Sequence, residues 1–144
     1  MTNRLEMVLL LTCFLCAATL LPRPLLAQGC DADEAMVASY VKDMTALADT
    51  TRKESLEQFE KSYHQKTSLT KLTLSLGLVK ELESCLDKDA QDPAATKEQA
   101  AGEKAKEAKY AKLQSTIEKD QKDLKAAGSS KDAKALIGKF DFAN

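Results

Sequence analysis

The first pattern along the chain is one continuous apolar stretch. It runs from Met7 to Leu21, is followed at once by Pro22, and gives way to the small residue Ala27. Such a run is too short, and too soon broken by proline, to span a bilayer stably, and a small residue after it suits cleavage by signal peptidase. The sequence therefore predicts a removed signal peptide over residues 1–27, a secreted or periplasmic protein, and no transmembrane helix in the mature chain.

After Cys30 the apolar residues recur every three or four positions, which is typical of an amphipathic helix. Asp31 and Glu34 have capping-box spacing at its start. Thr51 and Glu54 have the same spacing, so a second helix could begin there, but no glycine or proline enforces a break. We therefore favour one helix from Asp33 to about Gln65. Its apolar face comprises Met36, Val37, Tyr40, Val41, Met44, Leu47, Ala48, Leu56, Phe59 and Tyr63.

A second helix is expected from Leu69 to Leu86, after a turn at residues 66–68. The alternation of Leu72, Leu74, Leu76 and Leu78 would also fit a strand, but the sequence offers it no convincing partner strand, and an isolated strand is unstable. Residues 28–87 are thus predicted to form a helical hairpin. A linker follows at 88–93, where Asp92-Pro93 is a turn signal.

The last part of the mature chain, residues 94–144, is predicted to contain a charged helix and a short C-terminal helix. Residues 94–127 are rich in the helix formers Ala, Lys and Glu. Ser129 and Asp132 are suited to cap a helix from Lys131 to Ile137, with Gly138 ending it. The fold class is therefore all-α: a small helical bundle, one domain overall, built on the hairpin with a third Ala/Lys/Glu-rich helix.

Cysteine placement suggests one disulfide. Removing the signal peptide leaves only Cys30 and Cys85, and an even pair in an oxidising compartment is most simply a bridge. The predicted turn at 66–68 makes the two arms of the hairpin unequal by about 24 Å, so this pairing is geometrically difficult. Lipidation of Cys30, which would anchor the protein to the cell envelope, and a bridge between chains therefore stay open as alternatives.

Candidate chemistry along the chain is sparse. The net charge is −1 with the acidic and basic residues intermixed, which argues against a nucleic-acid partner. No catalytic residues, cofactor-binding residues or metal ligands stand out, and no cofactor is expected. His64 is the single histidine and is interpreted as a solvated surface or helix-edge residue.

The function predicted from the sequence is that of an exported, non-enzymatic helical protein that binds an unknown protein partner or has a structural role. The alternatives are a carrier of a small apolar ligand between its helices and a lipid-anchored envelope protein attached through Cys30. The residues expected to contact a ligand or partner are Met36, Tyr40, Met44, Phe140 and Phe142. For the two phenylalanines we favour a structural role, in which they fold back to fill a core poor in aromatic residues.

Overall fold

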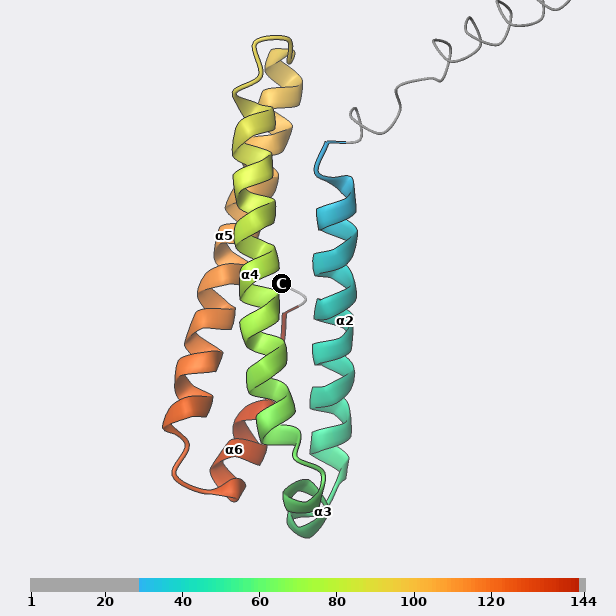
Figure 1. Cartoon of the computed structure of the whole chain (residues 1–144), viewed down its shortest axis with the longest axis vertical. Coiled ribbons are helices and arrows are strands. Elements are labelled where there is room, and N and C mark those ends of the chain that lie inside the picture. Colours follow the sequence, from blue (N-terminus) through green and yellow to red (C-terminus); the bar gives the residue numbers. More distant parts are fainter. Residues whose placement is uncertain (1–28, 143–144) are drawn as a thin grey trace, which may run out of the picture.

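The computed structural model describes residues 29–142 and confirms an all-α bundle (Figure 1). The predicted signal peptide, with Cys13 and Cys16, lies outside the described residues. The described part of the chain contains no strand, and none of its helices is long and apolar enough to cross a membrane. The elements are α2 (Asp31–Lys53), α3 (Leu56–Lys61), α4 (His64–Ala90), α5 (Lys97–Ala126) and α6 (Ser130–Ile137).

The largest correction concerns the corner between α2 and α4. The single helix expected from Asp33 to Gln65 is wrong: α2 ends at Lys53, and α3 follows as a separate six-residue helix. Ser55 starts α3 through a capping box, in which its hydroxyl accepts from the Gln58 amide and the Gln58 side chain accepts from the Ser55 amide. Capping at Ser55 satisfies backbone groups that a continuous helix would otherwise pair, so the chain can turn here.

This corner removes the geometric difficulty of the disulfide. The expected turn at residues 66–68 is wrong, because those residues lie inside α4. Helix α2 has 23 residues, and α4 takes about as many to climb from His64 back to Cys85, so the two arms match in length. The predicted pair Cys30 and Cys85 accordingly lies at disulfide distance, with the Cα atoms 5.8 Å apart.

Helix starts and ends differ from the sequence prediction in other places. Cys30 is the N-cap residue of α2 and makes no side-chain capping bond, so the predicted cap at Asp31 is wrong. Helix α4 continues to Ala90, which moves the linker from residues 88–93 to 91–96. Thr96 and Gln99 then form a second capping box at the start of α5.

The short C-terminal helix is confirmed, with the Ser129 hydroxyl accepting from the Asp132 amide at its start. The chain then turns at Gly138, whose carbonyl accepts a 2.7 Å hydrogen bond from Arg52 of α2. Residues 139–142 run back up between the long helices (Figure 1), and Phe142 lies beside residues of α2 and α4. Helix α6 and this tail thereby fill space that the three long helices leave open.

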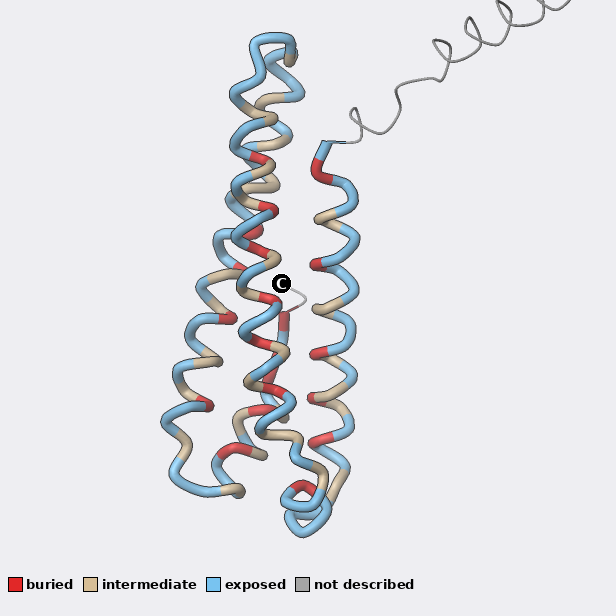
Figure 2. The backbone as a smooth tube through the Cα atoms, viewed as in Figure 1, coloured by how far each residue is buried: buried red, intermediate tan, exposed pale blue. Residues whose placement is uncertain are grey.

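The core lies along the inward faces of the helices, as the buried positions in Figure 2 show. Helix α4 is central, because it packs against α5 along most of its length and against α2 on another side. The buried residues within each long helix follow one another at steps of three, four or seven positions, which is the spacing of one helix face. The principal buried apolar residues are Val37, Met44, Ala48, Phe59, Leu72, Val79, Leu82, Leu86, Leu113, Ile117, Leu124, Ile137, Phe140 and Phe142.

We predict that reducing the disulfide lowers the free energy of unfolding by about 4 kcal/mol, because the bridge closes a loop of more than fifty residues in the unfolded chain. Urea denaturation in metal-free buffer, with and without reductant, measures this difference. The double variant Cys30→Ala/Cys85→Ala should match the reduced protein and ignore reductant. Equal denaturation midpoints for oxidised and reduced wild type would contradict a stabilising intrachain bridge.

Candidate binding surfaces

The corner between α3 and α4 carries an open groove with a volume of about 380 Å³, which we call the corner groove. Its position is set by the three-part turn of α2, α3 and α4, with Ser130 at the start of α6 closing one side. Its lining combines apolar and polar side chains, a combination that suits a protein contact. The lining residues are Phe59, Glu60, Tyr63, Gln65, Lys66, Leu69 and Ser130.

Tyr63 is the most unusual residue of this groove. It is the N-cap of α4, and its φ of 56° places it in the left-handed region, which costs a residue with a β-carbon about 1–2 kcal/mol. Its side chain is nevertheless 74% exposed, so packing of the ring does not explain the conformation. Among the described residues it is the sole non-glycine with positive φ. Strained backbone of this kind is enriched at functional sites.

Two contacts hold the corner in place beneath the groove. His64 Nδ1 lies 2.8 Å from Glu54 Oε1, which joins the start of α4 to the residue that ends α2. The His64 ring also packs edge-on against Phe59, with the ring centres 6.2 Å apart. His64 is the first residue of α4 and its side chain is only 20% exposed, so of the two interpretations the helix-edge position fits and the solvated surface residue does not. Its partner Glu54 is ten residues earlier, a spacing that no helical pattern reveals.

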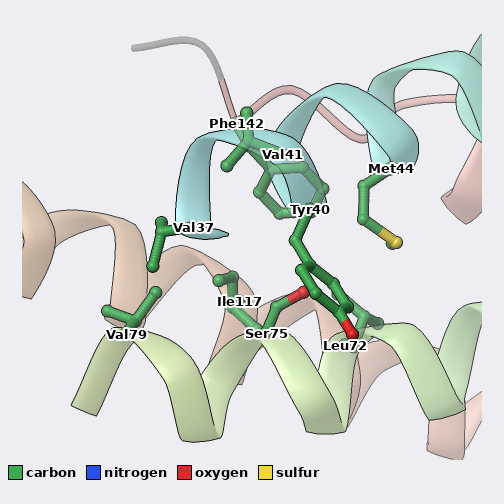
Figure 3. A pocket seen from close by; sticks show the side chains of 9 residues that line it. All are labelled: Val37, Tyr40, Val41, Met44, Leu72, Ser75, Val79, Ile117 and Phe142. Atoms are coloured by element: carbon green, nitrogen blue, oxygen red, sulfur yellow. The ribbon is translucent and has the colours of Figure 1, made fainter. Parts of the chain in front are cut away.

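A second hollow, the core cavity, lies between α2, α4, α5 and the C-terminal tail (Figure 3). Its volume is only about 10 Å³, which is room for one water molecule at most. Its walls are almost entirely apolar, with Ser75 as the exception, and the Ser75 hydroxyl donates to the Lys71 carbonyl. The lining residues are Val37, Tyr40, Val41, Met44, Leu72, Ser75, Val79, Ile117 and Phe142.

The structure brings together some of the residues predicted to contact a ligand or partner. Tyr40, Met44 and Phe142 all line the core cavity (Figure 3). Phe140 is buried beside Phe142, with the ring centres 5.5 Å apart, but it does not line the cavity. Met36 is 46% exposed and does not line the cavity. The corner groove was not predicted from the sequence. The local signal for the corner that forms it is the capping-box spacing of Ser55 and Gln58, and the continuous apolar face across this region concealed that signal.

A third hollow, the acidic pocket, lies at the opposite end of the hairpin, where α2 starts beside the loop between α4 and α5. Its volume is about 420 Å³. Lys106 extends into this region and pairs with Glu34 at 3.2 Å and Glu103 at 3.6 Å. The hydrogen bond to Glu34 raises the pKa of Lys106 above its usual value. The lining residues are Gly29, Cys30, Asp31, Asp89, Asp92, Ala94, Ala95, Gln99, Glu103 and Lys106.

Comparison with known proteins adds no assignment to these surfaces: neither a protein-family model nor a curated protein or solved structure matches the chain.

We predict that Tyr63→Gly raises the free energy of unfolding by about 0.5 to 1 kcal/mol, because glycine adopts positive φ without steric cost. The matched variant Tyr63→Ala removes the ring but keeps the β-carbon, so it should give no such gain. Denaturant unfolding of the three proteins side by side measures the effect. A glycine variant no more stable than the alanine variant would show that the corner backbone is unstrained.

Proposed function

We propose that this chain is an exported, non-enzymatic protein that binds a partner protein through the corner groove. The observation that carries the proposal is Tyr63: an aromatic side chain that is 74% exposed and presented from a left-handed backbone position. Tyrosine is enriched among residues that dominate binding energy, because its ring buries a large area while its hydroxyl stays hydrogen-bonded.

The groove around Tyr63 suggests the chemistry of that partner. Among the lining residues Leu69 offers partly exposed apolar surface, Phe59 is only 2% exposed, and Glu60 and Lys66 are exposed charges of opposite sign. A partner segment with an apolar side chain, flanked by polar groups, would cover the ring of Tyr63 and meet both charges. Leu56, which is 40% exposed on the neighbouring α3, extends the apolar area beyond the groove.

The location and attachment of the protein form part of this proposal. The apolar stretch ending near Ala27 supports export. The placement of Cys30 next to Cys85 supports an intrachain disulfide over a lipid anchor, because a sulfur cannot carry a lipid and a disulfide at once. No catalytic role is included, because neither the sequence motifs nor the groove provides a defined nucleophile with its base.

The variant Tyr63→Asn tests the proposal, because asparagine tolerates the left-handed conformation and removes only the ring. The purified chain is chemically cross-linked in concentrated envelope extract or culture fluid from its source, and bound proteins are identified by mass spectrometry. We expect a captured exported protein whose affinity falls at least tenfold, by about 1.4 kcal/mol or more, in Tyr63→Asn.

The matched control is Leu74→Gln, which removes another exposed apolar side chain from the middle of α4, away from the groove. This control should bind the same partner as the wild type. The proposal fails if the wild type captures nothing, or if Tyr63→Asn and the wild type bind the partner equally well.

A second candidate function is carriage of a small apolar ligand, and the apolar core cavity favours it. Because the cavity is smaller than any such ligand, binding would require Phe142 to leave its position. Native mass spectrometry should then show a co-purified ligand, and a fluorescent apolar probe should bind. Phe142→Ala should bind that probe several-fold tighter than Phe140→Ala, because only Phe142 lines the cavity. A wild type with neither ligand nor probe uptake would argue against a carrier.

A further inference from the structure

The two cysteines share their end of the hairpin with a carboxylate. Cys85 and Asp89 are one turn apart on α4 and therefore face the same side of that helix. Asp89 Oδ2 lies 3.4 Å from Cys30 Sγ. The two sulfurs and a carboxylate oxygen of Asp89 all lie within 4.8 Å of one another. A disulfide sulfur carries no proton, so this approach is a van der Waals contact that places the carboxylate beside the sulfurs.

The backbone at this point leaves space for the carboxylate. Gly29 has a φ of 51°, and a β-carbon added to it would come within 2.9 Å of Asp89 Oδ2. A side chain at position 29 would therefore push Asp89 away from the cysteines. Glycine at this position both allows the left-handed turn into α2 and keeps the three potential ligand atoms together.

We propose that Cys30, Cys85 and Asp89 form a zinc-binding site when the disulfide is reduced. Two thiolates and one carboxylate are a ligand set that suits Zn²⁺, with a water molecule completing the tetrahedron. The pair of soft sulfur ligands disfavours Mg²⁺ and Ca²⁺, which prefer oxygen. The sulfurs need only separate to roughly 3.8 Å, as expected for two Zn–S bonds of about 2.3 Å.

The acidic pocket provides access and a favourable charge. It opens on Cys30 and Asp89, so an ion and a water ligand can reach them from solvent. Asp31, Asp92 and Glu103 line the same pocket and attract a cation. The positive charge of Lys106 opposes a cation, but its ion pairs with Glu34 and Glu103 compensate for it.

The chemistry balances in two steps. A dithiol reductant transfers two electrons and two protons to the Cys30–Cys85 bond, giving two thiols while the reductant becomes a cyclic disulfide. Zn²⁺ then replaces both thiol protons, which are released to solvent. Because the metal joins the same two residues as the disulfide, it closes the same loop and should restore stability lost on reduction.

The test compares the full mature chain in its oxidised and reduced forms, after anaerobic removal of the reductant. Zinc is titrated against a chromophoric chelator, and Co²⁺ is used as a spectroscopic substitute. We expect one equivalent of Zn²⁺ to bind the reduced chain and a thiolate-to-cobalt charge-transfer band to appear there. The oxidised chain should show neither. Zinc should also raise the thermal midpoint of the reduced chain.

Asp89→Asn should weaken zinc binding at least tenfold, because it removes one of the three protein ligands. Loss of a residue that only hydrogen-bonds to a metal ligand already lowers metal affinity by about tenfold or more. The matched control Asp87→Asn changes an exposed carboxylate of α4, which accepts a hydrogen bond from Gln91, and should leave affinity unchanged. If reduction unfolds the chain, one equivalent of zinc should restore its helical circular dichroism. No thiolate-to-cobalt band, equal affinity of Asp89→Asn and wild type, or a reduced chain that zinc does not refold would each overturn the site.

Discussion

The linkage of Cys30 to Cys85 sets the length constraint that the rest of the bundle obeys. A chain that leaves one cysteine as a helix and returns to the other as a helix must turn close to the midpoint between them. The corner at residues 54–63 is at that place, and it makes α2 equal in length to the returning part of α4. The two helices are thus held at both ends, by the sulfurs at one end and by the contact between Glu54 and His64 at the other.

The hairpin alone would leave a poor core, and the later parts of the chain complete it. Helix α5 has a thin apolar face, in which Leu113, Ile117 and Leu124 are the main aliphatic residues, and this face packs on α4. Helix α6 and the tail then add Ile137, Phe140 and Phe142 where the long helices leave space. Two of the four aromatic rings of the core thereby come from the segment after α6, while the corner contributes Phe59 and α5 contributes Tyr110.

The three hollows of the bundle differ in chemistry because they occupy different places along the hairpin. The core cavity is in its middle, where apolar faces meet and water is excluded. The corner groove and the acidic pocket are at opposite ends, where helices start or stop and polar groups are concentrated. The proposed partner site at Tyr63 and the proposed metal site at Cys30 therefore lie at opposite ends of the hairpin, and only the long helices connect them.

Local patterns in the sequence determined the helical class, the Ala/Lys/Glu-rich helix and the short helix capped by Ser129. They also made Cys30 and Cys85 the simplest disulfide pair, while lipidation of Cys30 and a bridge between chains stayed open. Apolar periodicity, helix propensity and capping act over a few neighbouring residues, so a local pattern reveals them. The cysteine pair follows from number alone, because only two cysteines follow the predicted signal peptide. The capping boxes at Ser55 and Thr96 were equally local, but the continuous apolar face across residues 36–63 concealed the first one.

Only the tertiary structure decided which residues meet across the bundle. The pairing of His64 with Glu54, the strained and exposed Tyr63 and the approach of Asp89 to Cys30 all depend on where the helices lie in space. Helical periodicity tells which face of a helix is buried, but not which neighbour covers it. That choice follows from the corner and the disulfide acting together, because they fix the register of α2 against α4.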